Sequence, residues 1–189
     1  MNSKNHISKL AVGLFALVLF ASSCKKENGD EPLSLNNAKA VVSPVNTATI
    51  TGNWGSGSVS YGTIKLPLAA GDTALFTNRD NSYITAPAGY TVKYLYTTIS
   101  STASIGTAQY ALATTASAAG VGYNTGGGTP NGWYDYIPPG GITIIDYVYI
   151  FITNPLTLVT YVIKVVDVTP QQSGALDRAI IDVEYGVVN

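Results

Sequence analysis

The chain has 189 residues and a formal net charge of −1, and only 11% of its residues are charged. A charge this sparse and balanced excludes the basic surface with which proteins hold nucleic-acid phosphates. The 13 tyrosines, together with many Val, Ile and Thr residues, are typical of β-strands.

Residues 1–23 are predicted to be a lipoprotein signal peptide. Lys4 and Lys9 precede the apolar run Leu10–Phe20, which is too short to span a bilayer but suits the core of a signal sequence. Small residues follow and lead to Cys24, in an arrangement that resembles a bacterial lipobox. An ordinary secretory signal is the alternative. Lipidation is favoured because Cys24 is the only cysteine and therefore has no disulfide partner.

The residues after the signal peptide divide into a tether and a domain. Residues 24–35 are polar, charged and unpatterned, which predicts a flexible link between lipid and domain. Residues 36–189 have the length of one ordinary domain. We therefore expect a protein held by its lipid at the outer membrane, facing either the periplasm or the cell surface.

The first half of the domain is predicted to contain short strands separated by glycine-rich and polar turns. A first edge strand is expected around Val41 and Val42, and an ambiguous segment is interpreted as a strand leading into a loop. In chain order the further segments are the strands Ser58–Leu66, Thr73–Thr77 and Tyr90–Thr98, then the ambiguous Thr107–Gly120, and then the glycine-rich loop Gly120–Gly132.

The second half of the domain carries the strongest strand patterns. Ile142–Thr153 is apolar on both faces, which predicts a central strand covered on both sides. After a turn at Asn154 and Pro155, Thr157–Val168 is expected to return as its hairpin partner, and Leu176–Val187 to close the chain. The whole pattern predicts an all-β, antiparallel, sandwich-like single domain.

Most catalytic chemistry is excluded by composition. The single histidine, His6, and the single methionine, Met1, both lie in the predicted signal peptide. Histidine-based triads and His- or Cys-based zinc sites are therefore ruled out of the domain, and neither an enzyme nor a structural metal is expected. Asp182 and Glu184 would share one strand face about 6–7 Å apart, a spacing open to glycoside hydrolysis but common on solvated strands.

Aromatic residues next to the glycine-rich loop are the remaining candidates for ligand contact. Trp133, Tyr134 and Tyr136 follow the loop, and Tyr123 lies within it. Packing is the favoured role for Trp133 and Tyr134, because most tyrosines and tryptophans of a β-domain pack in its core. Stacking on a flat ligand, a sugar ring or a haem is the alternative.

The last third of the chain resembles the HmuY family of haem-binding lipoproteins of Bacteroidota. The resemblance lies in the order of four segments: GWYDY, DYVYIFITNP, TYVIKVVDV and SGALDRAIIDVEY, beginning at Gly132, Asp146, Thr160 and Ser173. It implies an all-β protein anchored at the cell surface, which captures haem and delivers it to an outer-membrane receptor.

The sequence departs from that family in its iron ligands. Family members bind haem iron through histidine, and some relatives use methionine, whereas this domain has neither and reads PPGGIT where a histidine often stands. Haem binding would then be lost, weakened or recast through a tyrosinate, a ligand that some haem proteins use. The candidates are Tyr123, Tyr134 and Tyr136. The competing hypothesis is a non-enzymatic envelope protein that binds a glycan or another protein.

Overall fold

The computed structural model describes residues 45–55, 63–68, 71–77, 82–137, 141–173 and 176–189. The predicted signal peptide, Cys24, the tether and the expected strand at Val41 and Val42 lie outside these residues, as do residues 58–62 of the second predicted strand. The strands in chain order are β1 (Asn46–Gly55), β2 (Thr63–Pro67), β3 (Thr73–Thr77), β4 (Ile84–Thr85), β5 (Thr91–Tyr96), β6 (Thr114–Thr115), β7 (Tyr134–Ile137), β8 (Gly141–Ile144), β9 (Val148–Thr153), β10 (Thr160–Ser173) and β11 (Leu176–Val187).

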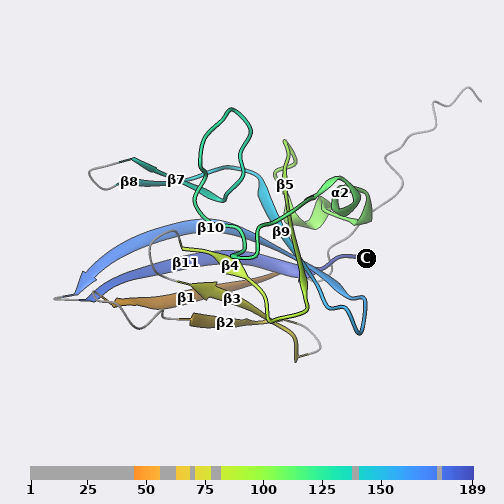
Figure 1. Cartoon of the computed structure of the whole chain (residues 1–189), viewed down its shortest axis with the longest axis horizontal. Helices are drawn as coiled ribbons and strands as arrows, with labels where there is room; N and C mark the ends of the chain where they lie inside the picture. Colours follow the sequence, from red (N-terminus) through yellow and green to blue (C-terminus); the bar gives the residue numbers. More distant parts are fainter. Residues whose placement is uncertain (1–44, 56–62, 69–70, 78–81, 138–140, 174–175) are drawn as a thin grey trace, which may run out of the picture. The chain divides into compact units, whose positions relative to one another are not determined.

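The described strands form three antiparallel sheets (Figure 1). The large sheet has the order β1-β11-β10-β9-β5-β6, the second has the order β2-β3-β4, and β7 pairs with β8 alone. The prediction of an all-β antiparallel fold is therefore confirmed. The first and last strands lie side by side, since Asn46 pairs with Tyr185 and Gly55 with Leu176.

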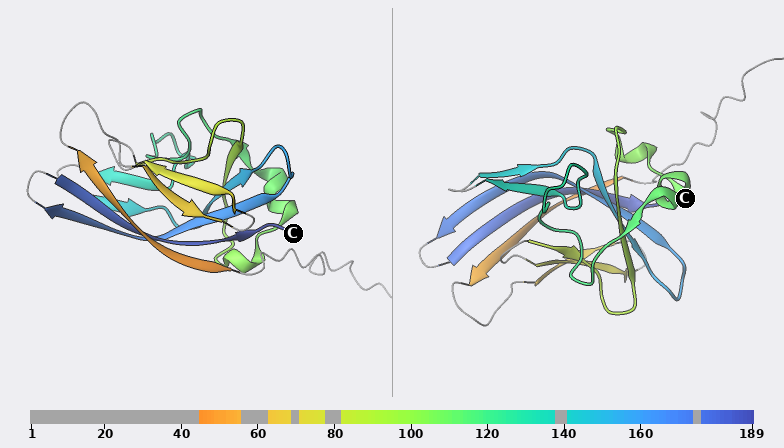
Figure 2. Two further views of the ribbon diagram at one scale, coloured as in Figure 1. Left: turned by 90° about the horizontal axis from the view of Figure 1, so that it is seen from below. Right: turned by 45° about the horizontal axis from the view of Figure 1, so that its top comes forward.

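The main hydrophobic core lies between the large sheet and the β2-β3-β4 sheet, whose strands cross the large sheet in Figure 2. It forms because alternate residues of each strand point the same way. Both sheets contribute buried aliphatic and aromatic side chains, among them Leu66, Phe76 and Ile84 from the small sheet and Ile50, Ile163 and Ile181 from the large one.

A second, smaller core covers the opposite face of the large sheet. Tyr149, Phe151 and Val162 are buried there together with Ile105, which lies between the 3-10 helix η3 (Thr102–Ser104) and helix α2 (Thr107–Leu112). In β9 the intervening residues Val148, Ile150 and Ile152 face the main core. The expectation that this strand is central and covered on both sides is confirmed.

The C-terminal meander follows its sequence pattern closely. β11 has the predicted bounds, with Ile181 and Val183 buried, and β10 pairs with β9 as the predicted hairpin. The register of β10 against β11 shifts between Val165 and Asp167, where Val166 is the extra residue of a β-bulge.

Two predicted segments differ from the structure. Ile142–Thr153 is not one strand: it divides into β8 and β9, because Tyr147 adopts φ +62° and turns the chain out of the β7-β8 hairpin into the large sheet. Thr107–Gly120 was expected to begin as a strand, but residues 107–112 form α2. That helix is stabilised at its start by the side chain of Gln109, whose Oε1 accepts a 2.9 Å hydrogen bond from the Gly106 amide.

Candidate functional site

Trp133 lies in the main core with only 1% of its surface exposed. Its indole Nε1 donates a 3.0 Å hydrogen bond to the backbone oxygen of Ser82, so its polar atom is satisfied inside the protein. The ring packs against Phe76 and Tyr134, with centroids 6.5 and 4.5 Å apart. Trp133 therefore joins the loop before β7 to the small sheet, and no face of its ring is open to a ligand.

The three candidate tyrosines occupy different environments. Tyr134 is buried in the main core, and its ring lies 5.9 Å from the ring of Tyr123, which is half-buried. Tyr136 follows on β7 and is 46% exposed. The structure thus brings Tyr123 together with Trp133 and Tyr134 in one aromatic group, and leaves Tyr136 outside it.

Two glycines of the glycine-rich loop are required by backbone packing. A Cβ on Gly132 would lie 2.2 Å from the Gly122 oxygen, and one on Gly120 would lie 2.3 Å from the Ile84 oxygen. Gly120 also has φ +102°, a conformation that L-residues rarely adopt. The close approach that glycine permits at these positions is therefore between segments of the chain itself.

The base of the loop is closed by two asparagines. Asn131 Oδ1 accepts the Thr125 amide at 2.8 Å, and Asn124 Oδ1 accepts the Asn131 amide at 3.2 Å. Asn124 also donates a 2.8 Å side-chain hydrogen bond to Asp135 on β7. These contacts hold the base of the loop against the strand that carries the predicted aromatic residues.

A shallow groove lies where the large sheet meets the small one. The segment Ala116–Val121 bridges the two, because the Ala116 amide donates to the Val92 oxygen of β5 and the Val121 amide donates to the Ile84 oxygen of β4. Two hollows, of about 340 Å³ and about 240 Å³, border this segment. Both are lined by Thr115, Ala116 and Ser117, so we call them together the Thr115–Ser117 groove.

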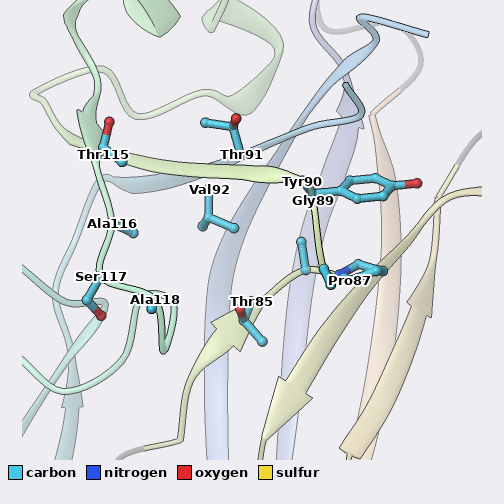
Figure 3. Close-up of a pocket in the computed structure, with 12 residues that line it drawn as sticks. Thr85, Pro87, Gly89, Tyr90, Thr91, Val92, Thr115, Ala116, Ser117 and Ala118 are labelled. Carbon is cyan, nitrogen blue, oxygen red and sulfur yellow. The ribbon is translucent and has the colours of Figure 1, made fainter. Parts of the chain in front are cut away.

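The larger hollow is shown in Figure 3, with residues 115–118 along one wall and residues 85–92 along the other. The ring of Tyr90 points away from residues 115–118. Four residues of the lining carry a hydroxyl group: Thr85, Thr91, Thr115 and Ser117. In the part of the chain that the structure describes, no charged side chain lines this hollow.

The smaller hollow contains the one sequence-predicted tyrosine that reaches the groove. Tyr123 lines it together with Tyr83 and Tyr94, and Thr125 and Asn131 add a hydroxyl and an amide. Among the described residues, this lining also contains no charged side chain. Aromatic surface beside neutral hydrogen-bonding groups can bind a polar, uncharged molecule, because it offers both stacking and hydrogen bonds without desolvating a charge.

A buried polar network, which shares Tyr90 with the lining of the larger hollow, was missed in the sequence. The carboxylate of Asp72 accepts hydrogen bonds from Tyr161 at 2.5 Å, Tyr90 at 2.7 Å and Asn154 at 2.9 Å. The bonds from Tyr161 and Tyr90 hold the pKa of the Asp72 carboxyl below its usual range, against the opposing effect of burial. The pKa of Tyr161 is raised by burial and by its bond to Asp72.

The sequence carried only a weak signal of this network. Asp72 follows Gly71, which has φ +80°, and the pair directly precedes β3, as a turn between two strands would. The partners of Asp72 lie 18 to 89 positions away along the chain, so no local pattern connects them. All its interactions are internal, and we assign it a structural role: it joins the β2-β3 turn to the large sheet.

The carboxylates of Asp182 and Glu184 on β11 also accept hydrogen bonds from other residues of the domain. Thr49 donates to Asp182 at 2.6 Å, and Thr102 donates to Glu184 at 2.5 Å. Nearby, burial raises the pKa of the Tyr149 hydroxyl to about 12, and this hydroxyl donates to the Ile99 oxygen at 2.9 Å. Among the described residues, no three His, Cys, Asp or Glu side chains gather in a group that could hold a metal ion.

Comparisons with protein-family models, with curated proteins and with solved structures give no match to this chain. Within the described residues, no helix is both long and apolar enough to cross a membrane.

Proposed function

We propose that this chain is a lipid-anchored envelope protein that binds a neutral glycan in the Thr115–Ser117 groove. The observation that carries the proposal is the lining of the two hollows, whose described residues supply hydroxyl, amide and tyrosine side chains and no charged group. Sugar rings offer hydroxyls to such polar groups and apolar C–H faces to aromatic rings.

The size of the hollows favours a small saccharide unit. The smaller hollow has about 240 Å³, below the ~300–1,000 Å³ usual for sites that enclose a drug-sized ligand. An open groove of this kind suits one or two sugar units of a longer chain that extends into solvent. The described residues of the two linings include no pair of carboxylates, and the proposal is therefore of binding without turnover.

The test is a glycan-array screen of the purified mature protein, followed by calorimetry on each hit. Thr115→Arg places a long cation in the wall shared by both hollows, and it removes no core contact because Thr115 is exposed. Thr114→Arg is the matched control, since neighbouring residues of a strand point to opposite faces. Loss of binding in Thr115→Arg and its retention in Thr114→Arg supports the proposal, whereas equal binding by both variants contradicts it.

A second candidate is haem bound through a tyrosinate, as the sequence resemblance suggests. Its supporting observation is that Tyr83, Tyr94 and Tyr123 line one hollow. Of the three predicted ligands Tyr123 is the one placed there, while Tyr134 is buried in the core. Titration with haemin should then shift the Soret band, and Tyr123→Phe should abolish the shift while Tyr136→Phe preserves it. The absence of a Soret shift in the wild-type protein contradicts this candidate.

The proposed anchor at Cys24 has its own experiment. Cells that express the full chain are fed an alkyne-labelled fatty acid, and the protein is recovered from the membrane fraction. We expect the label on the wild-type chain and its loss in Cys24→Ser, together with release of the variant from the membrane. An unlabelled wild-type chain would contradict the lipobox interpretation and leave the groove proposal standing.

A further inference from the structure

The turn between β9 and β10 exposes two leucines side by side. Leu156 is 91% exposed and Leu158 is 76% exposed, and Pro155 and Thr157 beside them are also exposed. We call residues 155–158 the hairpin tip. A single exposed leucine is ordinary on a protein surface, but two in one four-residue turn place two large apolar side chains in solvent within a short segment.

Leu158 also has an unfavourable backbone conformation. Its φ is +59°, in the left-handed region, where a residue with a Cβ is destabilised and where glycine or asparagine is normally found. No burial of the side chain compensates for this within the described structure, because most of Leu158 is in contact with solvent. The left-handed conformation of Leu158 therefore lowers the stability of the folded domain, while its apolar side chain stays exposed to solvent.

Hydrogen bonds fasten the base of the hairpin tip. Asn154 is 7% exposed, and its Oδ1 accepts the Leu156 amide at 2.8 Å while its backbone oxygen accepts the Leu158 amide at 2.9 Å. The side-chain nitrogen of the same asparagine donates to the buried carboxylate of Asp72. The orientation of the two leucines is thus fixed by the core of the protein.

The hairpin tip lies at the end of the large sheet where the chain enters it. β1 begins at Asn46, which pairs with Tyr185 near the end of β11. The last residues of β11 pair in turn with the start of β10, since Val187 pairs with Tyr161 and the Val188 amide donates to the Thr160 oxygen. Figures 1 and 2 show the hairpin between β9 and β10 at the same end of the sheet as the C-terminus.

We infer that the hairpin tip contacts the lipid bilayer in which Cys24 is anchored. This inference rests on the proposed lipid anchor. Residues 25–44 separate Cys24 from Val45 and span at most about 70 Å, so the entry end of the sheet stays within that distance of the membrane. The hairpin tip carries no charge, so its affinity comes from the transfer of leucine side chains out of water rather than from attraction to anionic lipids.

The test uses the full-length acylated protein reconstituted into phosphatidylcholine vesicles. Because Cys24 is the only cysteine and is consumed by acylation, Thr157→Cys provides one site for an environment-sensitive NBD fluorophore. Thr169→Cys is the matched control: it is an exposed threonine nine positions along β10 from Thr160, about 30 Å away. We expect a blue shift and quenching by doxyl-labelled lipid at position 157, neither at position 169, and no change in either result at high salt.

Substitutions then assign the signal to the leucines. Leu156→Ser with Leu158→Asn should abolish the blue shift while the protein still floats with the vesicles, because the anchor is intact. Ile137→Ser, which alters a 65% exposed side chain on β7, should leave the blue shift unchanged.

The failures of the two proposals are distinguishable. If the protein floats with the vesicles but NBD gives the same spectrum at position 157 as at position 169, the membrane contact alone is overturned. Failure to float overturns the anchor and the contact together. Protection of position 157 only in native envelope membranes, and not in protein-free vesicles, would show that the hairpin tip docks on a partner protein, which also overturns the lipid assignment.

Discussion

The hydroxyl of Tyr161 donates a 2.5 Å hydrogen bond to Oδ2 of Asp72, 89 positions earlier in the chain. Tyr161 lies in β10 of the large sheet, and Asp72 lies in the turn before β3 of the small one. With Tyr90 and Asn154 on the other carboxylate oxygen, this bond fastens three chain segments around one buried charge. These hydrogen bonds therefore stabilise the packing of the β2-β3 turn against the large sheet.

Tyr161→Phe should lower the free energy of unfolding by about 1.5–3 kcal/mol, because it removes a hydrogen bond to a charged group and leaves a buried carboxylate oxygen without that donor. Urea denaturation followed by circular dichroism measures the change. Tyr136→Phe is the control, since Tyr136 is about half exposed, and it should stay within ±0.5 kcal/mol of the wild type. Equal effects of the two substitutions on the free energy of unfolding would contradict this stabilising role of the Tyr161–Asp72 hydrogen bond.

Asp72 should also make the domain sensitive to acid. Its pKa is lowered in the folded state, so below about pH 5 the unfolded chain binds more protons than the folded one. The free energy of unfolding therefore falls as the pH falls through the usual carboxylate range toward the folded pKa. The quantity to measure is this free energy at several pH values in the wild type and in Tyr161→Phe.

The variant should lose less stability than the wild type over the same acid range, because Tyr161 is the largest cause of the lowered pKa of Asp72. Parallel pH profiles in the two proteins would show that other carboxyl groups dominate the acid response.

The sequence predicted those strands whose side chains alternate over many residues. β11 and the β9-β10 hairpin were found because their apolar residues recur with period two and face a buried surface. α2 was missed because its six residues are short of two turns and its capping contact is made by Gln109, which is also common in loops. The break at Tyr147 was missed because tyrosine gives no signal for a positive φ.

The candidate site was harder to predict, because burial depends on tertiary partners. Trp133, Tyr134 and Tyr136 are close in sequence, yet the first two are buried and the third is half exposed. Their difference arises from Phe76 and Ser82 of distant segments, which enclose Trp133. The groove itself depends on Thr115 and Ser117, residues of a kind that occur throughout this chain.

Gly132→Ala should destabilise the domain by roughly 3 kcal/mol or more. The new Cβ would lie 2.2 Å from the Gly122 oxygen and 2.5 Å from the Tyr123 carbonyl carbon, and both atoms belong to backbone that cannot rotate away. Thermal unfolding measures the effect. Gly141→Ala is the matched control, because its Cβ would meet nothing closer than 3.9 Å, and it should be neutral or slightly stabilising. A Gly132→Ala protein as stable as the control would contradict the close approach.

Replacing each leucine of the hairpin tip by glycine should change the free energy of unfolding in opposite directions. Leu158→Gly should stabilise the domain by up to about 1.6 kcal/mol, since relief of the left-handed conformation is worth roughly 1–2 kcal/mol and the added freedom of the unfolded chain opposes it by about 0.4–1 kcal/mol. Leu156 does not have a positive φ, so Leu156→Gly has only the unfavourable effect and should destabilise by about 0.4–1 kcal/mol. Urea denaturation of the two variants in solution, without membranes, measures the difference. Equal destabilisation by both would contradict the left-handed conformation of Leu158 and, with it, the argument that this turn sacrifices stability to present an apolar side chain.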